Sequence, residues 1–97
     1  QTVKRYEVEL KPRALKAVHE ELPPKVVDVV LYFINGPLRE NPQRVGKLLN
    51  APFRDTWSAR RGDYRIIYVI HKDLGKIAVL DIKHRSHAYA TRLLGRD

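Results

Sequence analysis

The sequence predicts an α+β fold with the order β-α-α-β-β-β, in which two helices pack on one face of a mostly antiparallel four-stranded sheet. An alternating strand pattern at the start of the chain is followed by two helical stretches. Three strand patterns joined by short turns then make up most of the second half. These elements fit one domain of 97 residues, and they leave the second face of the sheet open.

The N-terminal half contributes the first strand and both helices. Residues 3–10 alternate between polar and apolar side chains, which predicts a half-buried strand. Residues 12–22 are expected to form a helix, because Pro12 suits a first helical turn and apolar residues recur at i, i+3 and i+7. Residues 24–34 form a second helix whose valines need burial to stay helical. We expect Asn35-Gly36-Pro37 to end it.

The C-terminal half is predicted to be an antiparallel meander. Residues 38–53 form a connector with room for one helical turn. Strands follow over residues 54–61, 64–72 and 77–84, and the turns between them contain Gly62 and Gly75. Residues 86–93 are compatible with a short C-terminal helix.

The charge balance favours anionic partners. Nineteen Lys and Arg residues against eleven Asp and Glu residues give a net charge of +8 and a pI near 10.1. Such a surplus attracts nucleic acid, the ribosome or an acidic protein. The alternative explanation is that the charge only keeps the protein soluble. No apolar run reaches the roughly 20 residues that span a bilayer, and the N-terminus lacks the apolar core of a signal peptide, so we expect a cytoplasmic protein with no membrane contact.

Metal and cysteine chemistry are not expected. The chain has no cysteine, which excludes disulfides, thiolate ligands and a cysteine nucleophile. Its four histidines are dispersed and show no metal-ligand spacing, so we expect no metal site and no cofactor.

Strand alternation gathers cations on the open face. The face of Arg65 is expected to include Ile67 and Val69, opposite Tyr64, Ile66, Tyr68 and Ile70, which with Trp57 are expected to fill the core. On the last strand, Asp81, Lys83 and Arg85 are expected to oppose Ala78, Leu80, Ile82 and His84. Arg60 falls on the same face as Thr56 and Ser58. The pattern therefore predicts a phosphate site built from Arg60, Arg65, Lys83 and Arg85.

Four motifs, in order along nearly the whole chain, carry a family resemblance: Gly36-Pro37-Leu38, Arg44-Val45-Gly46-Lys47-Leu48, the run from Ala59 to Tyr68, and His84-Arg85-Ser86-x-x-Tyr89. Together they resemble the RelE-type toxins of the RelE/ParE toxin–antitoxin superfamily. The resemblance implies a single RelE-like toxin domain over residues 1–97 that acts as a ribosome-dependent, metal-independent endoribonuclease. Such a toxin cleaves mRNA in the ribosomal A site, inhibits translation and is held inactive by a cognate antitoxin.

The resemblance also implies roles for individual residues. Arg65 matches the arginine that contacts the scissile phosphate, Arg85 the one near the leaving group, and Tyr89 an aromatic residue on which a messenger base stacks. Arg60, Arg61, Lys83 and Lys47 are the expected RNA-binding cations. The competing interpretation of Arg65 is a cross-strand ion pair with Asp81.

The general base is unassigned, because two lysines of the family's second meander strand are replaced here by Thr56 and Ser58. Lys47 and His87 are candidates, against the alternatives of a solvated lysine and an exposed turn residue. Asp81 is a poorer base if it is paired with arginine. We expect His84 to face the helices as a structural histidine.

Two other functions remain open. A ParE-like toxin would inhibit DNA gyrase by binding, without hydrolysis, but the combination of Arg65, Arg85 and Tyr89 argues against that branch. A catalytically weakened RNA-binding relic is the other alternative, because the two family lysines are missing. Antitoxin binding would not separate these functions.

Overall fold

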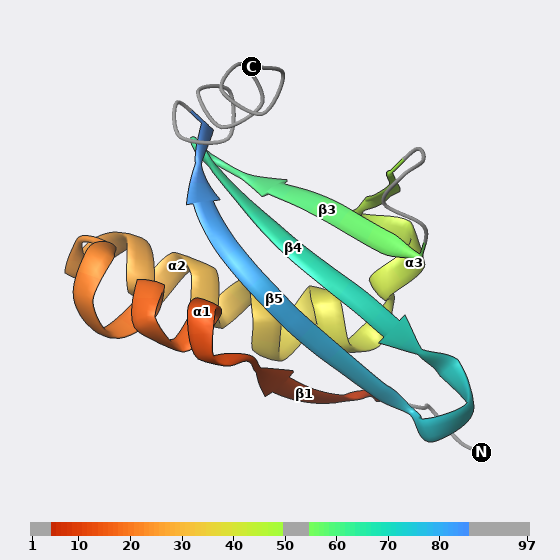
Figure 1. Cartoon of the computed structure of the whole chain (residues 1–97). Helices are drawn as coiled ribbons and strands as arrows, with labels where there is room; N and C mark the ends of the chain where they lie inside the picture. The colour runs from red at the N-terminus through yellow and green to blue at the C-terminus, as the bar shows by residue number, and fades with distance from the viewer. Residues whose placement is uncertain (1–4, 50–54, 86–97) are drawn as a thin grey trace, which may run out of the picture.

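The computed structural model describes residues 5–49 and 55–85, which form one five-stranded sheet with helices on one face (Figure 1). The strand order is β1-β5-β4-β3-β2. The strands are β1 (Glu7–Leu10), β2 (Lys47–Leu48), β3 (Thr56–Arg61), β4 (Tyr64–His71) and β5 (Lys76–His84). Among these described strands, only β1 and β5 pair in parallel. The α+β class is confirmed.

The expectation of four strands is wrong by one, because part of the predicted connector is a strand. Lys47 and Leu48 pair with Ser58 and Trp57 and add β2 to the edge of the sheet. A two-residue strand is too short to show alternation in the sequence, so only its pairing with β3 reveals it.

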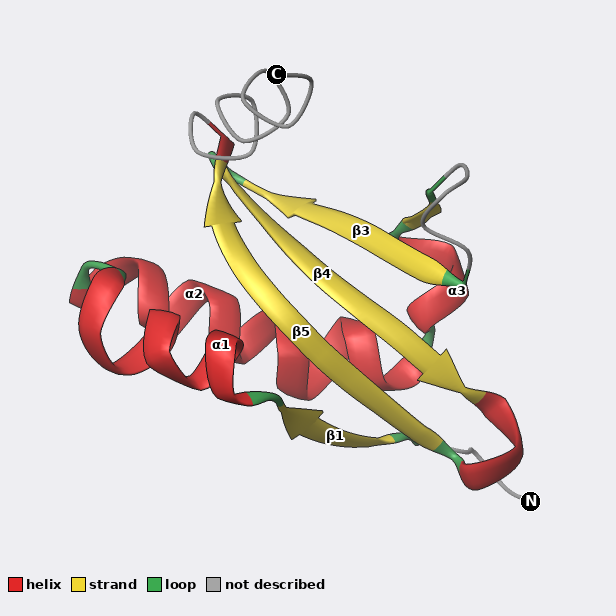
Figure 2. Ribbon diagram, viewed as in Figure 1, coloured by secondary structure: helices red, strands yellow, loops and turns green. Residues whose placement is uncertain are grey.

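The described residues form three α-helices, α1 (Pro12–Lys16), α2 (Pro24–Phe33) and α3 (Pro42–Val45). In the view of Figure 2 the helix that starts with α2 passes behind β5, and α1 lies beside β5. Each of the three helices begins with proline, which loses nothing at the first turn because that N–H has no partner within the helix. The helical turn expected in the connector is α3. None of the described helices is long and apolar enough to cross a membrane.

Both long helices continue through a widened, π-helical turn. The first runs on through η1 (Ala17–Glu21) and ends at Leu22, before two prolines, as predicted. The second runs on through η2 (Ile34–Leu38), so the predicted stop at Asn35-Gly36-Pro37 is wrong. Ile34 and Leu38 are both buried, and their burial favours continued helix. The Arg5 guanidinium also donates to the carbonyl of Asn35 at 2.7 Å, which satisfies an acceptor near the proline.

The core lies between the helices and the rear face of the sheet. Val30, Phe33 and Leu38 of the helical layer share it with sheet residues that include Ile66 and Tyr68. Trp57 lies half-buried against this core, and its ring stacks on Tyr68 with centroids 6.4 Å apart. The prediction that Tyr68 fills the core is confirmed.

An extra residue in β5 changes the phase of strand alternation. Ile67 pairs with Asp81 while Tyr68 pairs with Val79, so Leu80 is an unpaired bulge residue. After the bulge, Ile82 is buried against the helices, as expected. Before it, Val79 points into the core and Ala78 pairs with Val69 on the other face. The predicted inward position of Ala78 is therefore wrong, because one extra residue reverses the faces of all residues before it.

Candidate nucleic-acid interface

Three cations lie side by side across the open face of the sheet. Arg60 pairs with Arg65, and Arg65 pairs with Lys83. Each is the residue next to a strand end, where β3, β4 and β5 come together at the top of Figure 1. Directly opposite side chains have Cβ atoms roughly 4.5–5.5 Å apart. We call Arg60, Arg65 and Lys83 the cation row; strand alternation predicted that they share a face.

Lys47 extends this charged face to the sheet edge. It pairs with Ser58, which pairs with Ile67 on β4, so the three share the face of the cation row. Lys47 is exposed, whereas Ser58 is only 8% exposed. Since Ser58 and Arg60 are two residues apart, Lys47 lies diagonally from Arg60, roughly 7–8 Å away across the strands.

Arg85 directly follows β5 and lies next to the turn between β3 and β4 that contains Asp63. Its backbone N–H donates to the Asp63 carbonyl at 2.7 Å, which fixes the chain there. Its guanidinium Nη1 is 3.9 Å from Asp63 Oδ1, and the two side chains are 73% and 66% exposed. An ion pair so long and so exposed is weak, so the guanidinium is available to an anion.

The Asp81 carboxylate, close to Lys83 of the row, has several partners. Asp81 Oδ2 accepts from Arg13 Nε at 3.3 Å and lies 3.9 Å from Lys83 Nζ, while Oδ1 accepts from the Ile82 N–H at 2.8 Å. The Asp81 side chain is 16% exposed. Within the part of the chain that the structure describes, no ion pair joins Asp81 to Arg65. The structure therefore does not support the alternative in which Asp81 neutralises Arg65.

Arg13 is a member of this charged face that the sequence analysis missed. It lies in the first turn of α1, which packs along β5, and its guanidinium reaches Asp81. An arginine in a first helical turn gives no local signal of such a contact, because the contact joins residues 68 positions apart.

Arg61 is separated from the row although it is adjacent to Arg60. It pairs with Tyr64 on the helix side of the sheet, and its guanidinium carbon lies 4.0 Å from the centroid of the Phe33 ring. Its Nη1 also donates to the Arg60 carbonyl at 3.1 Å. The structure thus places Arg61 in a cation–π contact at the edge of the core, on the side of the sheet opposite the cation row.

His84 also lies on the helix side of the sheet. It pairs with Tyr64, and the two rings meet edge to face with centroids 5.0 Å apart. This position agrees with the structural role expected from the sequence. Tyr89, His87 and the predicted C-terminal helix lie outside the described residues.

The open face can bind a polyanion and stabilise negative charge. Fixed guanidinium groups suit this task because they stay charged and donate two parallel hydrogen bonds to phosphate oxygens. Among the described residues there is no group of three His, Cys, Asp or Glu side chains that could hold a metal ion. Lys47 adds a side-chain amine to this face, next to the row.

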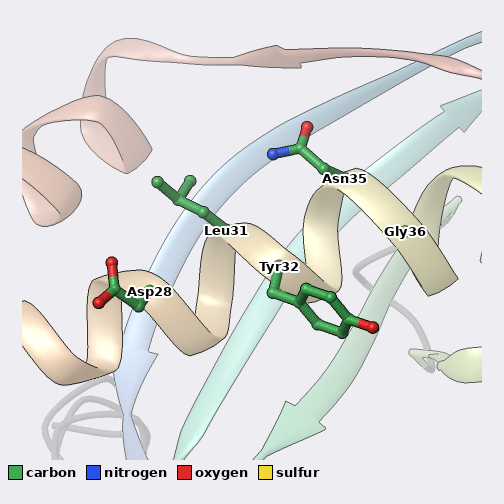
Figure 3. A pocket seen from close by; sticks show the side chains of 5 residues that line it. All are labelled: Asp28, Leu31, Tyr32, Asn35 and Gly36. Carbon is green, nitrogen blue, oxygen red and sulfur yellow. The ribbon is translucent and has the colours of Figure 1, made fainter.

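A hollow lies on the helical side of the protein (Figure 3). It has a volume of about 390 Å³ and is lined by Asp28, Leu31, Tyr32, Asn35 and Gly36. Its lining contains no cation, and its residues belong to α2 and η2. The hollow therefore does not form part of the cationic face.

Comparisons with known proteins agree with this architecture. The family model described as ParE toxin of type II toxin-antitoxin system, parDE, matches residues 8–89. Toxin RelE of Mycobacterium tuberculosis is 39% identical over 70 residues, which cover 72% of each chain. Toxin RelG of the same organism is 37% identical over 84 residues, covering 87% of this chain and 95% of RelG.

The family model and these relatives define the class as the toxin component of a type II toxin–antitoxin pair, and solved structures agree with it. The RelBE2 toxin–antitoxin complex of M. tuberculosis contains a chain that matches with a TM-score of 0.79 and 37% identity, over 84% of this chain and 99% of that one. The isolated E. coli RelE toxin matches with a TM-score of 0.65 at 18% identity, over 92% and 98%, and shows the shared fold alone. This chain belongs to the RelE/ParE family of type II toxins and is of RelE type.

Proposed function

We propose that this protein is a ribosome-dependent, metal-independent endoribonuclease that cleaves mRNA in the ribosomal A site and thereby inhibits translation. The observation that carries the proposal is the position of Arg65 between Arg60 and Lys83 on an open face. Within the described residues, neither Arg60 nor Arg65 has a carboxylate partner. A phosphodiester backbone is the polyanion that such a row fits.

The reaction uses a nucleophile that the substrate supplies. The 2′-hydroxyl of the nucleotide before the cut attacks the adjacent phosphorus, and the bond from phosphorus to the 5′-oxygen breaks. A cyclic phosphate and a free 5′-hydroxyl result. The enzyme must accept the proton of the 2′-hydroxyl, neutralise the phosphoryl oxygens and give a proton to the leaving oxygen.

The proposed roles combine the positions of the described cations with the family resemblance. Arg65 binds the scissile phosphate and stabilises the charge that builds on it, and Arg60 and Lys83 hold the flanking backbone. Arg85, at the hairpin end, lies near the leaving group. Tyr89 stacks on a messenger base, a contact worth roughly 1–3 kcal/mol in single-strand binders. Lys47 contacts the RNA backbone beside the row, and Lys47 and His87 are the proposed candidates for the proton acceptor.

A cognate antitoxin is the second proposed partner. Relatives have been solved as toxin–antitoxin complexes, among them RelBE2 of M. tuberculosis and a RelE–RelB complex of Pyrococcus horikoshii. We propose that an acidic or amphipathic antitoxin segment covers the cation row. Arginine-selective labelling of the free protein and of the complex tests this idea: Arg65 and Arg85 should be protected in the complex, and equal labelling in both states would contradict it.

Inhibition of DNA gyrase without hydrolysis is the other candidate function, because the matching family model is described by ParE toxins. Purified protein is added to ribosomes translating a defined mRNA, and primer extension maps any cuts; a parallel assay measures supercoiling by gyrase. The proposal predicts cuts at fixed positions in the reading frame and normal supercoiling. Intact mRNA together with blocked supercoiling would replace the proposal with the gyrase function.

A further inference from the structure

We infer that Tyr68 is a positioning residue, whose buried hydroxyl fixes α3 and β2 to the sheet and so places Lys47 on the open face. Tyr68 and Lys47 lie on opposite faces of the sheet, so the effect passes through the backbone. The inference rests on the proposed function only for the task of Lys47, a phosphate contact beside the cation row.

The hydroxyl of Tyr68 makes one long-range hydrogen bond from inside the core. Tyr68 is fully buried in the middle of β4, and its hydroxyl donates to the Pro42 carbonyl at 2.6 Å. Pro42 is the first residue of α3, the helix that leads directly into β2. Burial raises the pKa of Tyr68 to about 12, so the hydroxyl keeps its proton and remains a donor at physiological pH.

The backbone at Gly46 packs against the same hydroxyl. A Cβ atom at this position would overlap the Tyr68 oxygen and lie 2.9 Å from the Ser58 carbonyl. The chain between α3 and β2 therefore passes close over the phenol, and only glycine leaves room for it. The next residue is Lys47, which pairs with Ser58. The bond to Pro42 and the contact at Gly46 thus fix the chain on both sides of α3.

Strand β2 needs such an anchor because it is short. It has two residues, and one further bond, from the Leu49 N–H to the Thr56 carbonyl at 2.8 Å, follows it along the edge. Two-residue edge strands are weak on their own. The stacked Trp57 ring fills the flank of Tyr68, and Trp57 is in turn the pairing partner of Leu48. The Tyr68 side chain therefore supports both residues of β2, through Gly46 next to Lys47 and through Trp57 opposite Leu48.

Phenylalanine would fill the same volume, so Tyr68→Phe removes the bond to Pro42 and retains the packing. We expect amide hydrogen exchange at Lys47 and Leu49 to become faster in Tyr68→Phe, while exchange at Ile66 and Ile82 stays slow. Tyr64→Phe, on the same strand, is the matched control and should leave the β2 amides unchanged. Gly46→Ala disturbs the same contact from the other side and should give the pattern of Tyr68→Phe.

Binding to mRNA-programmed ribosomes tests the link to Lys47. Tyr68→Phe and Lys47→Ala should weaken binding to a similar extent, and each should lower the salt slope of binding by about one unit. The double variant should bind no more weakly than Lys47→Ala alone, since Tyr68 acts through Lys47. Lys47→Arg keeps the positive charge, so it should retain most of the wild-type binding. In combination with Tyr68→Phe it should lose that binding.

Two results would overturn the inference: unchanged exchange at Lys47 in Tyr68→Phe, or losses of binding that multiply in the double variant. A failure of the proposed function gives a different pattern. The wild-type protein would then not bind programmed ribosomes, while hydrogen exchange would still decide whether Tyr68 holds β2 in place.

Discussion

Arg60 and Arg65 lie directly opposite each other on β3 and β4, on the face of the sheet that no described helix covers. Like charges at directly opposed positions destabilise a sheet. Lys83 continues the row on β5, and the Asp81 carboxylate is shared between Lys83 and Arg13. The free protein therefore bears an electrostatic cost that a bound polyanion would relieve.

Arg60 and Arg61 are neighbours with opposite effects on stability. Arg60→Gln relieves like-charge repulsion and should raise the free energy of unfolding by about 0.2–1 kcal/mol at low salt. Arg61→Gln removes the contact with Phe33 and should lower it by about 0.5–1 kcal/mol. Urea unfolding at low and high salt measures both changes. A stabilising effect of Arg60→Gln that persisted unchanged in high salt would contradict the electrostatic explanation.

Two glycines should respond differently to alanine. Gly46→Ala forces a Cβ atom into the Tyr68 hydroxyl and the Ser58 carbonyl, so it should lower stability by about 1–3 kcal/mol. Gly36 lies within η2, and an added Cβ would meet no atom within 4 Å. Gly36→Ala should therefore be neutral or stabilising, by up to about 1 kcal/mol. Thermal unfolding of both variants tests the prediction, and equal losses would show that the contact at Gly46 has been misjudged.

Alkaline pH should weaken the fold through Tyr68. Its pKa rises from 10.0 to about 12 on folding, so the folded state holds the proton more tightly than the unfolded state does. The resulting stability is fully present below pH 10 and is lost as the pH rises toward 12, at up to about 1.4 kcal/mol per pH unit. Urea unfolding at pH 9 and pH 11.5 measures the loss. Tyr68→Phe should show a smaller fall over this interval, and an equal fall would assign it to other groups.

Local patterns predicted the part of the site that depends on strand period. Arg60, Arg65 and Lys83 come to one face because each lies in a regular stretch of strand, where side chains alternate with a period of two. The same rule failed at Ala78, since the bulge at Leu80 is set by the pairing of β5 with β4. No pattern within β5 itself identifies the extra residue.

Tertiary contacts decided what the sequence could not show. Lys47 lies in a strand only because Ser58 and Trp57 are available to pair with it. The second helix passes through Pro37 because Ile34 and Leu38 have a core to enter, which outweighs the stop signal of Asn35-Gly36-Pro37. Arg13 reaches Asp81 from a helix far along the chain. Each case joins segments whose proximity is a property of the completed fold.

The most direct test of the central claim is the single-turnover rate of mRNA cleavage at saturating ribosome for Arg65→Ala and Arg85→Ala, which separates chemistry from binding. Each substitution should lower the rate by roughly 10²-fold or more, as expected when one preorganised charge stabiliser is lost, while folding stays intact. Lys47→Ala should keep most of the rate if Lys47 is only a phosphate contact, and a loss as severe as that of the arginine variants would make it the proton acceptor. Arg61→Gln is the control, because its contact with Phe33 lies on the other side of the sheet. Near wild-type rates in both arginine variants would contradict the claim that the scissile phosphate is bound at this end of the sheet.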